Sequence, residues 1–573
     1  MLRPAQHFEE RRDPRTGERY VAVSRRGAAL KDDPLLNKGT CFTLDERDAL
    51  GLRGVIPPAM STQLEQEERA YDNYRKAADD ISRYLFLASL QDRNETLFYR
   101  LVLDHLEEMI PIIYTPTVGK VCERYSHIYR RPRGVYVSTQ DRGHVVDVLK
   151  NVDRDDVRII VATDNEAILG IGDQGVGGMG ISIGKVSLYT AGAGIHPAHG
   201  LPLDIDVGTD NAALLKDPLY LGVRHPRIRG DEYFSLLDEL VDAIKVVFPR
   251  ALVQWEDFAN EQAFQVLRRY RSTLASFDDD IQGTGAVVEA GVRTALARIG
   301  QKLGEQRVVF YGAGASGAGC ALQIRHAMRA EGMAKAEIDR RVICLDSKGL
   351  ILKDRPGLSG HKADIAADPS IVRGWPIGGR AFLLADVVAN YKPTILVGAS
   401  GQPGTFTESI ITAMLGGCAR PIVLAMSNPT SKIEATPQDV LRWTNGAAIM
   451  GTGSPFAPVD LNGVTHYIGQ CNNALVFPGI GMGAAIAKAR SMPDEVFSAG
   501  ARAVHEFTGV TSAPGASIFP PLSKLRAVSR AVAVNAAQAL VDTNAAPPME
   551  RTEIERRVDA AVWEPDYLPY RAG

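Results

Sequence analysis

The strongest constraint on the fold is a series of short apolar runs, each followed by a segment long enough to hold a helix. The runs are RVVFYG (307–312), RVICLD (341–346), TILVGA (394–399), PIVLAM (421–426) and AIMG (448–451). Continuous apolar strands that alternate with helices are typical of a parallel sheet covered on both faces. We therefore expect an α/β protein whose second half contains a doubly wound, Rossmann-like parallel sheet.

The first of these runs leads directly into a glycine-rich turn. Gly312, Gly314 and Gly317 form the pattern G-x-G-x-x-G between the expected strand and the next helix. The first glycine permits a tight turn, the second lets the backbone approach a pyrophosphate, and the third lets the helix pack closely on the strand. Such a turn is often only structural, but the strand before it and the helix after it favour a dinucleotide site.

Asp346 ends the second apolar run, where a carboxylate can accept a hydrogen bond from the adenosine ribose. This position favours NAD over NADP, because a 2′-phosphate would meet a negative charge. Lys348 and Lys362 follow closely and could offer a phosphate a cation. The sequence therefore predicts NAD as the cofactor and leaves NADP as an alternative.

Three adjacent carboxylates, Asp278, Asp279 and Asp280, precede a glycine-threonine-glycine turn in FDDDIQGTGA. Adjacent like charges repel, and carboxylates beside apolar residues are costly unless something compensates them. One interpretation is a solvated acidic turn that caps the next helix. The alternative is a Mg²⁺ or Mn²⁺ site, to which Glu256 and Asp257 of QWEDFANE would add oxygen ligands.

The first third of the chain lacks this alternation. Residues 1 to about 35 are polar and predict a mobile arm, and the residues from about 45 to 130 have a helical pattern. Asn94 is a candidate helix cap and Pro111 a candidate helix stop. Two further apolar runs predict strands joined by a turn: RIIVAT (158–163) and AILGIG (167–172).

Composition argues against several kinds of partner. The formal net charge is −3, with both signs interspersed, so no nucleic-acid partner is expected. No apolar run reaches the roughly 18 residues that a membrane span needs, and the first residues lack the apolar region of a signal peptide. We expect no membrane partner and a cytoplasmic location.

Several longer motifs together resemble those of the malic enzymes. They occur in the order found in that family, and the resemblance extends from about residue 35 to 540. The motifs are IIYTPTVG (112–119), TDNEAILGIGDQGVGGMGISIGK (163–185), WEDFA (255–259), FDDDIQGT (277–284), SNPTSK (427–432) and CNNALVFPG (471–479).

The resemblance implies roles for the charged residues. Glu256, Asp257 and Asp280 match the three metal-ligand positions of the family. Lys185 matches the catalytic lysine, and Asp279 matches the carboxylate that pairs with that lysine. The family usually has asparagine at the position of Asp278, to which no role is assigned.

The implied reaction is oxidative decarboxylation of L-malate to pyruvate and CO₂. Lys185, as a neutral amine, would take the hydroxyl proton while hydride leaves C2 for the nicotinamide. The metal would act as a Lewis acid, and Tyr114 matches the position that protonates the resulting enolate. Asn428 and Asn473 match asparagines that contact the substrate or the nicotinamide ribose.

One position departs from the family pattern. TDNEAILG carries Ala167 where the family normally has an arginine that binds the substrate carboxylate. A small residue there also resembles the malolactic enzymes, relatives that keep NAD bound and release lactate. A catalytically silent dinucleotide-binding regulator is the third hypothesis, and the retention of Lys185 and of the metal carboxylates speaks against it.

The resemblance also implies a domain plan and a homo-oligomer, either a tetramer built as a pair of dimers or a dimer. The dinucleotide domain is expected as an insertion into a second α/β domain. The expected parts are an N-terminal arm and helical domain (1–131), an α/β substrate and metal domain (132–281 plus 469–540), the dinucleotide domain (282–468) and a C-terminal tail (541–573).

Overall fold

The computed structural model describes residues 7–573 except 153, 155, 359, 377–380 and 512. The chain forms two compact units. Unit 1 comprises Met1–Asn165, Gln174–Ala251 and Ala561–Gly573, and unit 2 comprises Glu166–Asp173 and Leu252–Ala560. Within the described residues, no helix is long and apolar enough to cross a membrane.

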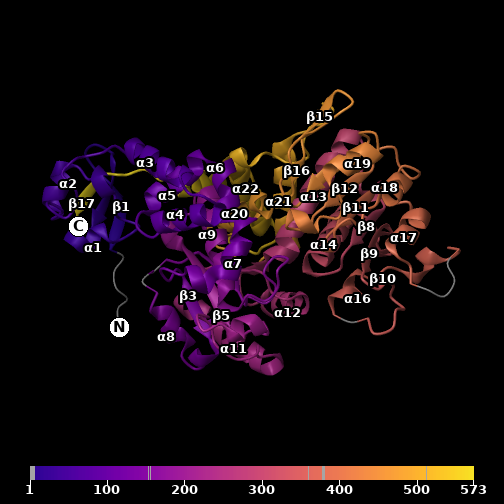
Figure 1. Cartoon of the computed structure of the whole chain (residues 1–573), viewed down its shortest axis with the longest axis horizontal. Coiled ribbons are helices and arrows are strands. Elements are labelled where there is room, and N and C mark those ends of the chain that lie inside the picture. The colour runs from indigo at the N-terminus through magenta and orange to yellow at the C-terminus, as the bar shows by residue number, and fades with distance from the viewer. Residues whose placement is uncertain (1–6, 153, 155, 359, 377–380, 512) are drawn as a thin grey trace. The chain divides into compact units, whose positions relative to one another are not determined.

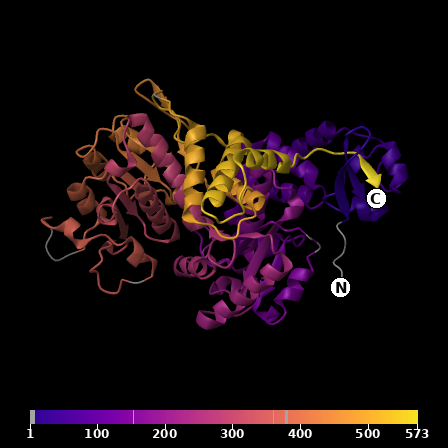
Figure 2. The ribbon, with the colours of Figure 1, turned by 180° about the vertical axis from the view of Figure 1, so that it is seen from behind.

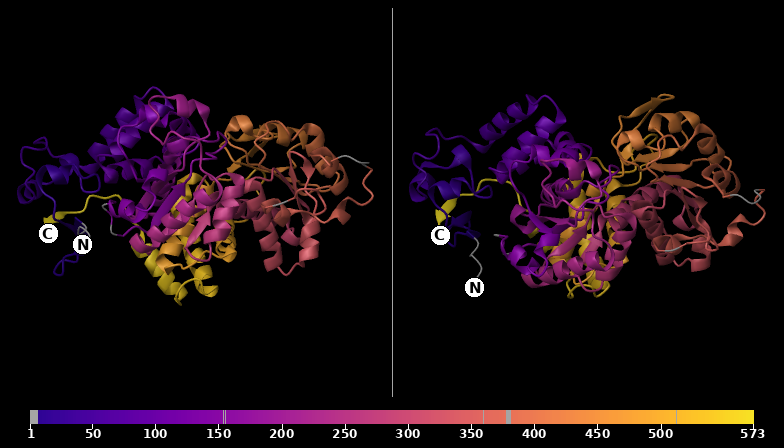
Figure 3. Two further views of the ribbon diagram at one scale, coloured as in Figure 1. Left: turned by 90° about the horizontal axis from the view of Figure 1, so that it is seen from below. Right: turned by 60° about the horizontal axis from the view of Figure 1, so that its bottom comes forward.

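Both ends of the chain contribute to one small sheet of unit 1. Strand β1 (Phe8–Arg12) pairs antiparallel with β2 (Arg19–Val23), and β17 (Tyr570–Ala572) pairs parallel with β2. Figures 2 and 3 show the yellow β17 beside the indigo N-terminal elements. Helices α1 (Gly27–Lys31) and α2 (Leu44–Ala49) follow.

The expectation of a mobile arm is therefore wrong for residues 8–31, and residues 1–6 of that arm lie outside the described residues. The reason is tertiary. Val23 and Leu30 enter an apolar cluster with Phe42 and Tyr570, so this polar segment is ordered by a partner strand from the far end of the chain.

The helical pattern of the next residues is confirmed. The Asn94 side chain accepts a hydrogen bond from Leu97 N and caps α5 as expected. Pro111 does not stop a helix, because α6 begins only five residues earlier and continues to Ile113. The helices are α3 (Gln63–Arg75), α4 (Asp80–Gln91), α5 (Glu95–Asp104), α6 (Leu106–Ile113) and α7 (Thr117–Ile128).

A parallel sheet completes unit 1, with strand order β3-β5-β4. Its strands are β3 (Val135–Ser138), β4 (Ile159–Thr163) and β5 (Gly200–Asp206), so the run RIIVAT is a strand as expected. The helices of this part are α8 (Val145–Lys150), α9 (Met179–Ala193), α10 (Ala212–Lys216) and α11 (Gly230–Val247).

The run AILGIG is not a strand. Residues 167–172 form turns closed by an isolated bridge between Ile168 and Gly172. Leu169 has a φ of 46°, which is incompatible with an extended strand. The backbone amides of Ala167 and Leu169 donate hydrogen bonds to Asp257, and these contacts replace a sheet partner.

Unit 2 contains the doubly wound sheet, and all five apolar runs form its strands (Figure 1). The strand order is β10-β9-β8-β11-β12-β13-β16, and the pairs are parallel except for the edge pair of β10 with β9. The strands are β8 (Val308–Tyr311), β9 (Val342–Asp346), β10 (Gly349–Leu350), β11 (Ile395–Gly398), β12 (Ile422–Ala425), β13 (Ile449–Thr452) and β16 (Gly469–Gln470).

Both faces of this sheet are covered, because successive residues of β11 and β12 are all buried. On one face, Val309, Leu396 and Val423 pack with Val387 and Ile411 of the covering helices. The helices around the sheet are α14 (Ala315–Ala330), α15 (Lys335–Arg341), α16 (His361–Ile365), α17 (Leu384–Tyr391), α18 (Glu408–Met414) and α19 (Pro437–Trp443). The predicted α/β class is confirmed.

The rest of unit 2 is a helical layer, a parallel strand pair and a hairpin. Gly479 and Gly483 of α20 let α22 approach closely, since a Cβ at either would lie 2.6 Å from a carbonyl oxygen of α22. The elements are β6 (Leu252–Trp255), α12 (Asn260–Tyr270), β7 (Ser276–Asp278), α13 (Thr284–Ile299), β14 (Val459–Leu461), β15 (Val464–His466), α20 (Phe477–Ala487), α21 (Asp494–Thr508), α22 (Leu525–Asp542) and α23 (Arg551–Ala561).

Candidate active site

The three carboxylates expected to hold a metal come together at the ends of two neighbouring strands. β6 and β7 are parallel, so their carboxyl ends meet at one edge. Glu256 and Asp257 directly follow β6, and Asp280 follows β7. One oxygen from each of the three side chains lies within 4.8 Å of the other two.

Hydrogen bonds fix the orientation of this carboxylate cluster. Gln254 Nε2 donates to Glu256 Oε2 at 2.7 Å, and the backbone N of Asp257 donates to Asp280 Oδ2 at 2.8 Å. Leu169 N donates to Asp257 Oδ1 at 3.1 Å. Each carboxylate is therefore held in place by a neighbour before any cation arrives.

The chemistry of the cluster fits a hard divalent cation. Glu256 and Asp257 are buried, and oxygen-rich carboxylate sets of this kind suit Mg²⁺ or Mn²⁺. The adjacent Asp278 is fully buried, and its Oδ2 has no hydrogen-bond partner. Burial, followed by repulsion from Asp280, raises the pKa of Asp278 well above its usual range. The site thus concentrates carboxylates whose mutual repulsion a bound cation would offset.

Asp279 lies in a wide helical turn, η5 (Asp279–Gly283), that follows β7. Its side chain folds over Gly283, where a Cβ would lie only 1.8 Å from Asp279 Oδ1. Asn473 Nδ2 donates to Asp279 Oδ2 at 2.9 Å and to Thr284 Oγ1 at 3.0 Å. The structure therefore brings together Asp279 and Asn473, two residues that the sequence placed in different roles.

Lys185 and Tyr114 come together in unit 1. Lys185 is fully buried on α9, and its Nζ lies 5.3 Å from the centre of the Tyr114 ring. Gly184 makes this approach feasible, because a Cβ there would lie 2.9 Å from the carbonyl oxygen of Ile113. The expected pairing of Lys185 with Asp279 joins residues of different units and stays a prediction.

The glycine-rich turn lies where the order of the strands reverses, between β8 and β11. Gly312 has a φ of 113°, and a Cβ there would lie 2.2 Å from the carbonyl oxygen of Ala399. A Cβ on Gly317 would lie 2.0 Å from the carbonyl oxygen of Gly312. The turn needs both glycines, and it leaves the start of α14 at the position where dinucleotides bind in such sheets.

Asn260 is a residue of this site that the sequence analysis missed. Its Oδ1 accepts a hydrogen bond from Ala315 N at 2.7 Å, at the first turn of α14. A Cβ on Gly314 would lie 2.8 Å from the same oxygen. Asn260 directly follows the motif WEDFA, and this position could have marked it as a site residue. The helix that it caps, α14, begins 55 residues later, so the contact itself was not visible in the sequence.

Asp346 ends β9, as expected, and is already paired with two cations. Arg355 donates to its two oxygens at 3.0 and 2.9 Å, and Lys362 Nζ donates to Oδ2 at 2.8 Å. Burial raises the pKa of Asp346, but these hydrogen bonds outweigh burial and lower it to about 2. Lys348 contributes its backbone N, at 2.9 Å from Oδ1. Arg355 was not identified from the sequence.

Asn428 follows β12, and its Oδ1 accepts a hydrogen bond from Ser454 Oγ at 2.5 Å. β12 adjoins β11, so Asn428 lies at the same edge of the sheet as Ala399 and the turn at Gly312. The cofactor residues expected on the sheet thus share its carboxyl edge.

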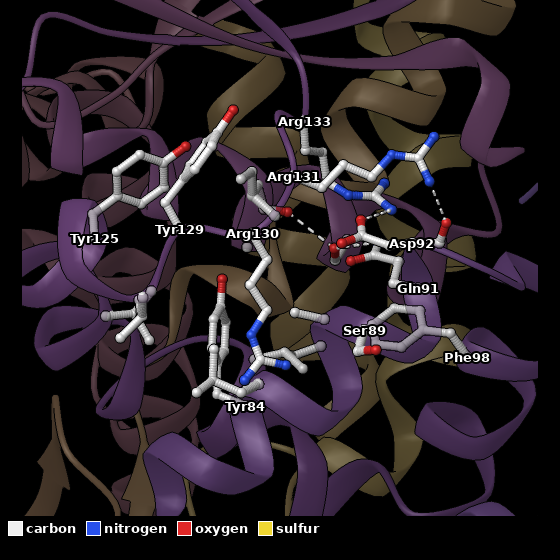
Figure 4. Close-up of a pocket in the computed structure, with 18 residues that line it drawn as sticks. Tyr84, Ser89, Gln91, Asp92, Phe98, Tyr125, Tyr129, Arg130, Arg131 and Arg133 are labelled. Carbon is white, nitrogen blue, oxygen red and sulfur yellow. Dashed lines mark hydrogen bonds and ion pairs between the residues drawn. The ribbon is translucent and has the colours of Figure 1, made fainter. Parts of the chain in front are cut away.

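A separate cavity of about 70 Å³ lies in unit 1 (Figure 4). Tyr84, Tyr125, Tyr129 and Arg130 line it, and Arg131 and Arg133 donate hydrogen bonds to Asp92 at its side. Gly184 and Ser187 of α9 form part of its wall, so the cavity backs onto the helix that carries Lys185.

A glycine-rich turn at the switch point of a doubly wound sheet and a nearby carboxylate cluster define a dinucleotide-binding α/β enzyme. The family models named "Malic enzyme, N-terminal domain" and "Malic enzyme, NAD binding domain" match residues 91–271 and 281–541. An NAD-dependent malic enzyme of Acinetobacter baylyi is 45% identical over 97% of this chain and 98% of its own, and one of Sodalis glossinidius is 46% identical over the same shares. The chain belongs to the malic enzyme family.

Solved structures agree on the fold. The crystal structure of the Entamoeba histolytica malic enzyme matches with a TM-score of 0.56 at 21% identity, covering 88% of this chain and 89% of that one. The malic enzyme of Pyrococcus horikoshii matches with a TM-score of 0.54 at 21% identity, covering 80% of this chain and 89% of that one.

Proposed function

We propose that this chain catalyses the oxidative decarboxylation of L-malate to pyruvate and CO₂, with NAD⁺ as the oxidant and a divalent cation at the carboxylate cluster. The observation that carries the proposal is the convergence of Glu256, Asp257 and Asp280 in a chain that also holds a dinucleotide turn. The relatives named NAD-dependent malic enzyme support the choice of substrate and cofactor.

Each residue of the proposed active site has a separate role in the reaction. Glu256, Asp257 and Asp280 would hold Mg²⁺ or Mn²⁺, which supplies Lewis-acid chemistry when bound. Lys185 takes the proton of the C2 hydroxyl while hydride leaves C2 for the nicotinamide. The C3–C4 bond then breaks, CO₂ departs, and the electron pair left at C3 is protonated by Tyr114. Lys185 and Tyr114 are both buried, and Lys185 Nζ lies 5.3 Å from the centre of the Tyr114 ring, which supports their serving one site.

Ala167 keeps a second function open. It donates its backbone N to the carbonyl of Asp257, beside the metal cluster, and its methyl group cannot bind a carboxylate. A malolactic enzyme, which converts L-malate to L-lactate and CO₂ with bound NAD, would use the same metal and base. The two reactions differ only in the fate of the hydride: a malic enzyme releases it as reduced cofactor, and a malolactic enzyme returns it to the product to give lactate.

The deciding experiment gives the purified protein L-malate, Mn²⁺ and NAD⁺, with NADP⁺ in a parallel run, and assays pyruvate and lactate separately. Pyruvate formed in step with reduced cofactor supports the proposal. Lactate without net reduction makes the protein a malolactic enzyme. If neither pyruvate nor lactate forms, the substrate is a different 2-hydroxy acid, and Ala167 is the first position to examine.

A lysine variant tests the base. Lys185→Ala should abolish turnover and leave cofactor binding intact, because the side chain acts on substrate and lies in a different unit from the dinucleotide turn. Lys245→Ala, a change on α11, is the matched control. Unchanged turnover in Lys185→Ala would remove this lysine from the mechanism.

We also propose that the protein works as a homo-oligomer, either a tetramer built as a pair of dimers or a dimer. The resemblance to the malic enzymes is the support. Light scattering on the purified protein measures the molar mass directly, and a monomeric mass would refute the proposal.

A further inference from the structure

Glu434 is a fully buried carboxylate whose partners all belong to two loops at the carboxyl edge of the dinucleotide sheet. Its Oε1 accepts hydrogen bonds from Ser400 N at 2.9 Å, from Ser400 Oγ at 2.8 Å and from Ser427 Oγ at 2.5 Å. Its Oε2 accepts a longer bond from Ser427 N at 3.4 Å. One side chain thus joins the loop after β11 to the loop after β12.

The two loops are also joined without the Glu434 side chain. Near their far ends, Gly404 N donates to the carbonyl oxygen of Ile433 and Phe406 N donates to that of Glu434, each at 3.1 Å. Nearer the sheet, the link runs through the same serine. Gly401 N donates to Ser427 Oγ at 2.9 Å, so that hydroxyl accepts from one loop while it donates to Glu434. Ser427 directly precedes Asn428 in the motif SNPTSK. A shift of Ser427 would therefore move the asparagine expected to contact the cofactor.

The backbone makes room for this carboxylate at a specific position. A Cβ on Gly398, the last residue of β11, would lie 2.6 Å from the Cδ of Glu434. A side chain at that position would push the carboxylate out of its place between the loops. Gly398 and Glu434 thus form a matched pair at the end of one strand.

A structural role alone explains Glu434 poorly. In the part of the chain that the structure describes, no lysine or arginine forms an ion pair with it. Burying a carboxylate without a cation is costly, and an apolar side chain of similar size would pack a core at lower cost. The contacts that justify this cost are the donors of the two loops, and the first of these loops borders the strand-order reversal where dinucleotides bind.

We propose that Glu434 is a positioning residue of the dinucleotide site: it fixes the loops at Ser400 and Ser427 so that Asn428 is presented to the nicotinamide half of the cofactor. The inference rests on the proposed function only for the identity of the cofactor. The adenosine half is served by other residues, the turn at Gly312 and the carboxylate of Asp346, on the far side of the reversal.

The test measures NADH and ADP-ribose binding to the full-length protein by titration calorimetry. ADP-ribose contains the adenosine and pyrophosphate parts and lacks the nicotinamide. Glu434→Gln should raise the Kd for NADH about tenfold, which corresponds to the loss of one charged hydrogen bond. The Kd for ADP-ribose should rise less, because Asp346 lies on β9, away from these loops, and only the Gly312 turn touches them, at Ala399 and Ser400.

The matched control is Glu289→Gln. Glu289 is equally buried in unit 2 and accepts hydrogen bonds from Gln323 and Ser498, but it also pairs with Arg293, at 2.7 Å, and it lies on α13, outside these loops. It should lower the melting temperature and leave the ratio of the two Kd values unchanged. If Glu434→Gln does not fold, Ser400→Ala removes a single hydroxyl and should change the ratio in the same direction.

Three outcomes would overturn the proposal: an unchanged ratio in both variants, an equal loss of NADH and ADP-ribose affinity, or the same ratio change in Glu289→Gln. The readout needs no turnover. A protein that binds NADH as expected but does not oxidise malate refutes the proposed function and leaves the role of Glu434 standing.

Discussion

Two strands of unit 2 end in an aspartate, and the two carboxylates meet opposite electrostatic surroundings. Asp346 at the end of β9 is bound by Arg355 and Lys362, which lower its pKa to about 2. Asp278 at the end of β7 is buried beside Asp280, and its pKa is raised well above the usual range. The same residue type in the same position of a strand is ionised in one case and resists ionisation in the other.

The difference shows that the end of a strand fixes where a carboxylate lies, whereas the neighbouring side chains decide whether that carboxylate is ionised. At β9 the chain provides its own cations, so the carboxylate is a ready acceptor for a neutral hydroxyl group of a ribose. At β7 the chain concentrates carboxylates, and the proposed cation would supply the compensating charge. One strand end thus already has its hydrogen-bond partners, and the other fits the metal site that we propose.

The largest effect is expected from a change in the carboxylate cluster that follows β7. Asp280→Asn removes one charged oxygen from the cluster, so Mn²⁺ affinity and turnover should both fall by more than roughly 100-fold, beyond what loss of an outer-shell partner costs. Electron paramagnetic resonance of free Mn²⁺ gives the affinity. Asp242→Asn on α11, whose carboxylate is largely exposed, is the control. Full Mn²⁺ affinity in Asp280→Asn would exclude this carboxylate as a ligand.

The next effect concerns the paired end. Asp346→Asn leaves Arg355 and Lys362 without their carboxylate, so NADH should bind about tenfold more weakly as a charged hydrogen bond is lost. NADPH should lose less affinity or gain some, because two cations then face its 2′-phosphate. Fluorescence titration with both reduced cofactors measures the ratio. Parallel losses for the two cofactors would contradict this account of specificity.

A smaller effect should follow from removing one cation. Arg355→Gln keeps Lys362 beside Asp346, so NADH affinity should fall only roughly threefold, in line with the modest worth of a partly exposed ion pair. NADPH affinity should fall further, since one of the cations available to a phosphate is gone. The same titration applies, and an unchanged Kd for NADPH would rule out a phosphate contact by Arg355.

The smallest effect is a pH dependence of stability. Because the folded-state pKa of Asp346 lies near 2, below its ordinary value of 3.8, its ion pairs stabilise the fold fully above that ordinary value. This contribution is lost as the pH falls from about 4 toward about 2. The difference in unfolding free energy between wild type and Asp346→Asn, from urea titrations, should shrink over that range. If the difference in unfolding free energy instead grows as the pH falls, the ion pairs of Asp346 do not stabilise the fold in this way.

The sequence correctly predicted those strands and helix ends that depend on residues close together in the chain. The five apolar runs are strands because each is buried on both faces, and Asn94 caps α5 because a cap needs only residues three positions away. The carboxylates at 256, 257 and 280 were expected together from the resemblance to the malic enzymes, and the structure brings them to the ends of two parallel strands. That role itself stays a proposal.

Contacts between distant segments decided the remainder. AILGIG has the composition of a strand, but its amides are taken by Asp257, about 90 residues later. The N-terminal hairpin depends on a strand from the other end of the chain. Asn260 contacts Ala315 and Glu434 contacts Ser400, segments that no local pattern joins to them. Arg355 lies only nine residues after Asp346, so its pairing was open to the same argument that singled out Lys362.

The sheet shared by β1, β2 and β17 has a consequence for the order in which the protein is made. The backbone N of Tyr570 donates to Glu46 Oε1, 524 positions earlier in the chain. During synthesis on the ribosome, β2 therefore emerges long before its parallel partner and keeps an open strand edge in the meantime. An open edge of this kind can pair with another chain, so docking of β17 onto β2 closes a site of aggregation as well as completing the sheet.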